Sequence, residues 1–239
     1  MAPIRSYSDW KTRASNKEKQ IEPFKHYYFI CEGQNTERWY FEKFIDMKKE
    51  FSIPAIVSIE YLEKTEEHKR WSDPKKLYDL AEISRKNGDI SFDPKHDTMI
   101  LVFDADIYES RDPSLYNEFI EKASKTNTIC VTNPSFELFL LLHYKNSYTE
   151  IILPNAGAII KNDWIEIGDE RIRYVEQLFR AKSGLYPKKD PAISELVKNI
   201  YTAIEQEKNL NNDILFCRGN LTSNIGIVMQ KILDEKIDE

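Results

Sequence analysis

Short apolar segments alternate with amphipathic segments as far as about residue 143, and this alternation predicts the fold. Aromatic and β-branched runs that are typical of buried strands occupy residues 27–30, 54–62, 98–103 and 127–131. Apolar residues at helical spacing follow each run, at about residues 36–48, 73–88, 112–125 and 136–143. Strands and helices in regular alternation predict an α/β protein with a mainly parallel sheet and helices on both faces.

The alternation ends near residue 151, and the remaining chain has a different pattern. Residues 169–182 and 190–208 are predicted to be helical, residues 213–217 to form a last strand, and residues 221–237 to form a closing helix. The helical segment is either an insertion or a C-terminal addition. We therefore expect a basic N-terminal arm at 1–25, an α/β core at 26–150, a helical segment at 151–212, and a last strand and helix packed back on the core at 213–239.

The overall charge restricts how the protein could bind a polyanion. With 34 basic and 40 acidic residues its formal charge is −6, which argues against coating nucleic acid by bulk electrostatics. Residues 1–25 differ, since six basic and three acidic residues give this arm a charge of +3. The arm either touches a phosphate backbone or is a solvated tail.

The cysteines and the N-terminal residues bear on the compartment. Three cysteines that lie far apart and form no C-x-x-C pair predict neither a disulfide framework nor a zinc knuckle. The N-terminus has no apolar signal core, and no run is long and apolar enough to span a bilayer. We expect a cytoplasmic protein that is not bound to a membrane.

Two aspartates stand at the end of the most apolar predicted strand. Asp104 and Asp106 are one residue apart, so in an extended chain their carboxylates point the same way and can converge on one cation. Two such charges about 4 Å apart repel by roughly 4 kcal/mol at an effective dielectric constant near 20, and a cation between them would offset this repulsion. Oxygen ligands favour Mg²⁺ or Mn²⁺ over zinc. The alternative is an ordinary polar loop after a strand.

Glu32 strengthens the prediction of a metal site. It also follows a buried strand, and Gly33 lets the chain turn sharply there. If the two strands are parallel neighbours, Glu32 and both aspartates emerge at the same edge of the sheet, where open α/β sheets bind ligands. Glu37 lies in the first turn of the next helix. It is either a catalytic acid or a residue placed there because the helix dipole favours a negative charge.

Glu137 is a further acidic candidate. It lies one turn into an otherwise apolar helix, where an ionised carboxylate needs free backbone N–H groups or a metal as its partner. His143 lies six residues further on, about 240° around the helix, so the two side chains do not share a face. A hydrogen-bonded core or surface histidine is the default interpretation for His143.

A basic stretch lies within the helical segment. Six basic residues and one acidic residue give residues 171–189 a net charge of +5, and the basic residues are Arg171, Arg173, Arg180, Lys182, Lys188 and Lys189. Aromatic residues are interleaved with them, and this composition suits a nucleic-acid backbone. A solvated helix face whose aromatic residues lie in the core is the alternative.

Taken in order, these motifs resemble the RloB-like family. The resemblance rests on Cys31-Glu32-Gly33 with Thr36 and Glu37, on Asp104-Ala105-Asp106, and on Asn133-Pro134-Ser135-Phe136-Glu137 through to His143. Asn220, Thr222 and Asn224 resemble the polar turn that opens the family's last helix. The family is regarded as carrying a variant toprim domain and occurs in prokaryotic restriction and abortive-infection loci.

The resemblance implies a toprim-like core at residues 26–150 and assigns roles to its acids. Glu32 would act as general acid or base, and Asp104 and Asp106 would hold Mg²⁺. Glu137 belongs to the RloB-like pattern and is a candidate for both roles, with Glu37 as a further catalytic candidate. The remaining motif residues would support the site, and they are Gly33, Thr36, Asn133, Ser135, His143, Asn220 and Thr222.

Three functions remain open from the sequence. The leading hypothesis, which the resemblance implies, is a Mg²⁺- or Mn²⁺-dependent nuclease that acts on DNA or RNA in anti-phage defence. The second is a non-catalytic toprim-like partner of a defence ATPase, and the third is a nucleotide-sugar-dependent transferase of the D-x-D type, which does not account for Glu32 or Glu137. A second copy of the chain is a further candidate partner. No G-x-S-x-G elbow, Walker loop or dinucleotide fingerprint supports other chemistry.

Overall fold

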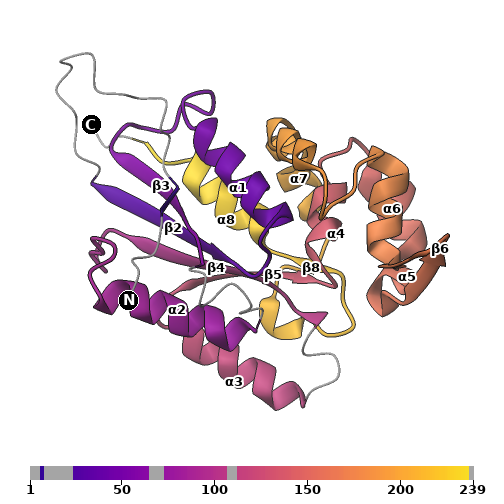
Figure 1. Cartoon of the computed structure of the whole chain (residues 1–239), viewed down its shortest axis with the longest axis horizontal. Coiled ribbons are helices and arrows are strands. Elements are labelled where there is room, and N and C mark those ends of the chain that lie inside the picture. Colours follow the sequence, from indigo (N-terminus) through magenta and orange to yellow (C-terminus); the bar gives the residue numbers. More distant parts are fainter. Residues whose placement is uncertain (1–5, 8–23, 65–72, 107–111, 237–239) are drawn as a thin grey trace.

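A six-stranded sheet in the order β1-β3-β2-β4-β5-β8 forms the centre of the molecule (Figure 1). The computed structural model describes residues 6–7, 24–64, 73–106 and 112–236. The four central strands are parallel, and the short outer strands are antiparallel to their neighbours. This confirms the predicted mainly parallel α/β fold. The strands of the sheet are β1 Ser6–Tyr7, β2 Lys25–Cys31, β3 Val57–Leu62, β4 Thr98–Asp104, β5 Thr128–Asn133 and β8 Thr222–Ser223.

Helices cover both faces of the sheet. Figure 1 shows α2 and α3 on one face and α1 and α8 on the other. The α-helices of the described residues are α1 Thr36–Asp46, α2 Pro74–Lys86, α3 Pro113–Ala123, α4 Phe136–Leu141, α5 Ala156–Lys161, α6 Tyr174–Ser183, α7 Ile200–Glu207 and α8 Ile225–Leu233. The π- and 3-10-helical segments of the described residues are Tyr148–Ile152, Leu153–Asn155, Pro191–Asn199 and Ile214–Phe216.

Local sequence signals explain where several helices begin. Asp73 and Asp112 each precede a proline, and each side chain accepts a hydrogen bond from a backbone N–H two residues later at 2.9 Å. These caps satisfy donors that a helix leaves free at its start, and the proline has no N–H to satisfy there. Helices α2 and α3 therefore start where the sequence predicts.

The register of the parallel strands brings their carboxyl ends together. Cys31 at the end of β2 pairs with Val102 of β4, and Asp104 pairs with Thr132 of β5. The apolar residues of these strands are buried on both faces of the sheet, so polar side chains can reach solvent beyond the strand ends. The residues that directly follow β2 and β4 consequently emerge at one edge.

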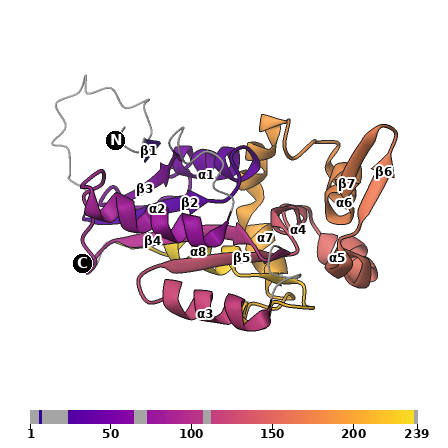
Figure 2. The same ribbon diagram turned by 60° about the horizontal axis from the view of Figure 1, so that its bottom comes forward.

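The chain from residue 151 to 212 is an insertion that shares the core of the α1 face. Figure 2 shows α5, α6, β6 and β7 together at one end of the sheet, close to α4. Phe179 of α6 and Val197 are fully buried in the same cluster as Phe41 and Phe139. Strand β8 and helix α8 then return to the sheet. The insertion therefore completes the core.

Two predicted elements are wrong. Residues 213–217 do not form a strand, because the Asp213 side chain accepts a hydrogen bond from Leu215 N at 3.0 Å and starts a 3-10 turn. The last strand is instead β8. Residues 169–182 do not form one helix, because β7 (Glu170–Arg173) pairs with β6 (Trp164–Ile167) around Gly168, and α6 begins only after this hairpin.

The predicted N-terminal arm is described only in part. Ser6 and Tyr7 pair with Leu62 and Tyr61 of β3, so this short piece lies on the edge of the sheet. The rest of the arm before Phe24 lies outside the described residues. Within the described part of the chain, no helix combines the length and apolar character needed to cross a membrane.

Candidate active site

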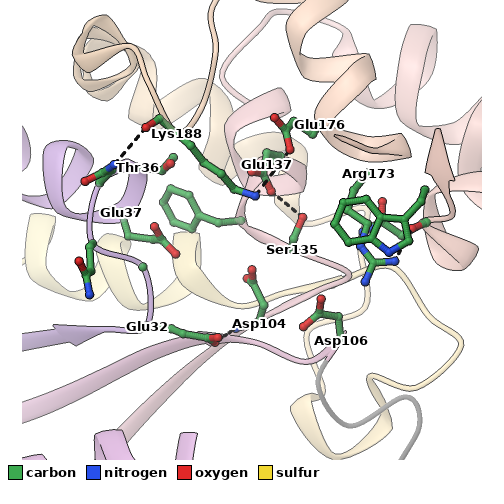
Figure 3. A pocket seen from close by; sticks show the side chains of 16 residues that line it. Glu32, Thr36, Glu37, Asp104, Asp106, Ser135, Glu137, Arg173, Glu176 and Lys188 are labelled. Atoms are coloured by element: carbon green, nitrogen blue, oxygen red, sulfur yellow. Dashed lines mark hydrogen bonds and ion pairs between the residues drawn. The ribbon is translucent and has the colours of Figure 1, made fainter. Parts of the chain in front are cut away.

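A cavity of about 460 Å³ opens at the carboxyl edge of the parallel strands (Figure 3). Its acidic wall comes from three separate stretches of the chain. Because β2 and β4 are parallel neighbours, the residues after them reach the same space, and α1 and α4 add their first turns. The acids on this wall are Glu32, Glu37, Asp104, Asp106 and Glu137.

Glu32 connects the ends of three strands. Its Oε2 accepts a hydrogen bond from the backbone N–H of Asp104 at 3.2 Å, and its own N–H donates to Val102 O at 2.9 Å. Lys64, just beyond β3, donates from Nζ to the carbonyl oxygen of Glu32. The side chain of Glu32 is therefore held against the aspartate pair.

Gly33 makes room for Glu37. A Cβ atom on Gly33 would lie 1.8 Å from Oε2 of Glu37, closer than any non-bonded contact allows. The carboxylate thus packs directly against the backbone at the turn after β2. Glycine is needed here for close approach.

Glu137 lies at the start of α4, a helix whose six residues are all buried. Ser135 precedes the helix, and its Oγ donates to Oε2 of Glu137 at 2.6 Å. Burial forces this carboxyl group to find partners, and Ser135 supplies one at the cavity wall. Figure 3 shows the pair facing the cavity from the side opposite Glu32.

The acids perturb each other. Burial raises the pKa of Glu32 to about 8, and the charges of Glu37 and Asp106 add to the rise. Burial, then the charges of Glu32, Glu37 and Glu137, raise the pKa of Asp104 well above its usual value. Burial also raises the pKa of Glu37 and of Glu137. A nearby cation would let more of these groups ionise together.

The donor chemistry fits a hard divalent cation, because each candidate ligand offers carboxylate oxygen. In the described part of the chain, no three His, Cys, Asp or Glu side chains lie close enough together to form a ready-made metal site. The carboxylates are instead spread over the cavity wall. To bind one ion, these carboxylates would have to move closer to one another. The residues concerned are Asp104, Asp106, Glu32 and Glu137.

The insertion forms the opposite wall of the cavity. Its lining residues are Asn162, Trp164, Arg173, Glu176 and Lys188. The segment after α6 is tied to the start of α1, since Thr36 Oγ1 donates to Pro187 O at 2.7 Å and Asn35 Nδ2 donates to Lys188 O at 3.0 Å. Thr36 therefore supports the site, as expected for a motif residue, by fixing this wall.

The six basic residues of the insertion have different surroundings. Arg173 and Lys188 line the cavity, and Lys188 Nζ lies 3.7 Å from Glu176. Arg180 is instead part of the insertion's internal structure, since it bonds Glu170 and Glu176 at 2.6 Å each. The other three lie outside the cavity lining, with Lys189 bound to Glu170 at 2.6 Å, Lys182 near the Tyr144 ring and Arg171 near the Trp164 ring.

His143 lies in the core outside the cavity lining. Its Nδ1 donates to Phe139 O at 3.1 Å, and its Nε2 accepts from the Tyr40 hydroxyl at 2.8 Å. Burial lowers the pKa of His143 to about 4, so the ring is neutral. The default interpretation of a hydrogen-bonded core histidine describes this arrangement.

The other motif residues hold the loop before β8. Asn133 Nδ2 donates to Cys217 O at 2.8 Å and to Asn220 O at 2.9 Å. Thr222 Oγ1 also donates to Asn220 O, at 3.1 Å. Asn224 bonds the backbone of β5 through both atoms of its amide, to Val131 N and to Ile129 O. These residues position the end of β5, and none of them lines the cavity.

Sequence reasoning missed several residues in or near the cavity, among them Lys64, Asn162, Trp164 and Glu176. Lys64 stands in a stretch of charged residues that gives no sign of its contact with Glu32. The hairpin that carries Trp164 had a usable signal, because apolar residues alternate on either side of Gly168-Asp169. Burial of Glu176 depends on the packing of α6 and had no local signal.

The fold and the cavity together define an α/β protein with an acidic site at the carboxyl edge of a parallel sheet. The family model described as RloB-like protein matches residues 27–232. This chain belongs to the RloB-like family. Since the match runs through the insertion, that segment is part of the family's common region. No curated protein and no solved structure matches the chain.

Proposed function

We propose that this protein is a nuclease that cleaves phosphodiester bonds of DNA or RNA with Mg²⁺ or Mn²⁺. One observation carries the proposal: acids from three separate stretches of chain share one cavity with Arg173 and Lys188. A toprim-like active site, which the family resemblance implies, needs acids of this kind at this edge of the sheet. The opposite basic wall suits an anionic backbone.

The acids could not receive a phosphate by themselves, because like charges repel. Asp104 and Asp106, with Glu32 and Glu137, would hold the divalent ion. When bound, such an ion neutralises charge on the scissile phosphate and makes a water molecule easier to deprotonate. Arg173 and Lys188 would orient the strand from the other side of the cavity.

Glu32 is the residue proposed to move the proton. Without a bound ion its pKa is about 8, and a nearby cation would lower it toward neutral pH, where a carboxyl group can both accept and release a proton. The N–H of Asp104 fixes one of its oxygens and leaves the other for water or the leaving oxygen. Glu37, packed on Gly33, is the second candidate for proton transfer.

Purified full-length protein should degrade at least one member of a panel of single- and double-stranded DNA and RNA in Mg²⁺ or Mn²⁺. Asp104→Ala should reduce the rate by about 100-fold or more, since it removes a ligand and the anchor of Thr132. Asp79→Ala, on the exposed side of α2, is the matched control and should keep full activity. Equal degradation by wild type and Asp104→Ala would indicate a contaminating nuclease and overturn the proposal.

We also propose a role for this activity in anti-phage defence, with an ATPase encoded nearby as partner. This part is supported by the family resemblance alone. Cleavage that appears only when the ATPase is added would support the partner, and full activity of the isolated chain would remove the need for it.

A further inference from the structure

The hairpin of β6 and β7 presents an exposed tryptophan to the cavity. Trp164 is 47% exposed and lines the same cavity as the acids. Arg173 is its direct partner across the hairpin, and the guanidinium carbon lies 4.2 Å from the centre of the Trp164 ring. Arg171, two residues earlier on the same strand face, lies 5.2 Å from that centre.

The hairpin does not need Trp164 for its own core. Neighbouring residues of a strand point to opposite faces, so Ile172 points away from both arginines. Ile172 is buried at 5% exposure, which marks its side as the packed face. Trp164, paired with Arg173, lies on the other face. The indole is 47% exposed even with the two guanidinium groups beside it, so part of this large aromatic side chain is available to a ligand.

The chemistry of this surface matches one kind of ligand. An indole offers a flat face to another ring, and the guanidinium groups beside it attract phosphate. Asn162, on the same wall, keeps its buried Nδ2 donor without a hydrogen-bond partner among the described residues. A ring that stacks, two cations and a spare donor together suit a nucleotide.

We propose that Trp164 stacks on an unpaired nucleobase of the substrate while Arg171 and Arg173 bind the adjacent phosphates. The inference rests on the proposed nuclease function in one respect: the strand bound at Trp164 is assumed to continue across the cavity to the acids. Bases inside a duplex are already stacked on each other and cannot offer a face to Trp164. The substrate is therefore a single strand, or carries an unpaired nucleotide beside the scissile bond.

Binding of short oligonucleotides tests this without cleavage. Full-length protein is titrated, with Ca²⁺ as the divalent ion, into fluorescein-labelled 12-nucleotide single-stranded DNA, single-stranded RNA and the corresponding duplex. Trp164→Ala should raise Kd for at least one single strand about tenfold, as expected for the loss of one stacked base. Trp164→Phe keeps a ring and should restore most of the affinity. Unchanged single-strand Kd values in Trp164→Ala, or an equal loss for the duplex, overturn the proposal.

Salt dependence separates stacking from charge. Removing one cationic side chain that binds a phosphate of a single strand lowers the slope of log K against log salt by about 0.7. Arg173→Ala should show this reduction, whereas Trp164→Ala should weaken binding with the slope unchanged. Tyr201→Ala removes a ring of similar exposure outside the cavity and should have no effect. If Trp164→Ala lowers the slope of log K against log salt as much as Arg173→Ala does, Trp164 does not act by stacking.

The two proposals fail separately. Trp164-dependent binding of single strands that no divalent ion converts to cleavage overturns the nuclease and supports the stacking site. Asp104-dependent cleavage with Kd and KM unaffected by Trp164→Ala supports the nuclease and overturns the stacking site.

Discussion

Glu207 and the carboxylates that line the cavity have opposite surroundings. Glu207 of α7 is 2% exposed and reaches the start of α8. Its Oε1 accepts from Gly226 N at 2.9 Å and from Ser223 Oγ, and its Oε2 accepts from Ile227 N at 3.0 Å. Glu32 accepts one backbone N–H and faces the charges of Glu37 and Asp106.

This difference separates a carboxylate that stabilises the fold from carboxylates that suit a ligand. Glu207 is buried and Glu32 is partly buried, and burial raises the pKa of both. Glu207 has donors for both oxygens, so it acts as a distant cap for a helix. The cavity acids have more negative charge than donors, an arrangement that stabilises the protein poorly and suits a cationic ligand.

The largest effect on stability is expected at Glu207. Glu207→Ala leaves the buried N–H group of Gly226 and the partly buried N–H group of Ile227 without their acceptor, and should lower the free energy of unfolding by about 3 kcal/mol. Urea denaturation measures this. Asp104→Asn instead removes repulsion among the cavity acids and, without divalent ions, should leave stability unchanged or raise it. A loss at Asp104→Asn as large as at Glu207→Ala would refute the comparison.

A smaller effect on stability is expected from a change in pH. The pKa of Glu32 is about 8 in the folded protein and near its ordinary value of 4.5 in the unfolded chain. The folded state therefore binds this proton more tightly, and the resulting stability is fully present below pH 4.5 and is lost as pH rises through 8. In EDTA, Tm should fall by several degrees between pH 5 and pH 8.

Two controls sharpen the pH experiment. Glu32→Gln should flatten the decline of Tm, because it removes the titrating group. Mg²⁺ should raise Tm more at pH 8 than at pH 5, since an ion competes with the proton. A Glu32→Gln profile identical to that of the wild type would show that other groups cause the decline.

The smallest effect on stability is expected at Gly33. Gly33→Ala pushes its new Cβ against the Glu37 carboxylate, the flexible end of a side chain, so folding should change by less than about 1 kcal/mol. Cleavage should nevertheless fall by about tenfold, because Glu37 is displaced. Gly157→Ala, with nothing within 4 Å of the new atom, is the matched control. Wild-type cleavage rates in Gly33→Ala would remove Glu37 from the mechanism.

Elements with strong local signals were predictable. The buried strands and the capped helices α2 and α3 follow from apolar runs and Asp-Pro pairs. The α/β order predicts that β2 and β4 are parallel, whereas their adjacency was only a condition of the prediction that Glu32 and Asp104 share an edge; the structure meets that condition. Local rules suffice where an element's own residues decide its structure.

Other features depend on distant contacts and were not predictable. A glutamate on an amphipathic helix is usually exposed, and only the position of α8 shows that Glu207 is a cap. Residues 213–217 have the composition of a strand, yet Phe216 is 69% exposed, because the Asp213 cap competes with extension. The second wall of the cavity depends on how the insertion folds back, which no local pattern encodes.

The two hydrogen bonds from Asn35 and Thr36 to the carbonyl groups of Lys188 and Pro187 join the start of α1 to the end of the insertion. The cavity acids and the basic wall are therefore built on one scaffold and keep a fixed spacing. Trimming the chain to residues 26–150 would strip α1 and α4 of their packing partners. An evolutionary change of substrate would consequently be expected through substitutions on the hairpin surface, with the insertion itself retained.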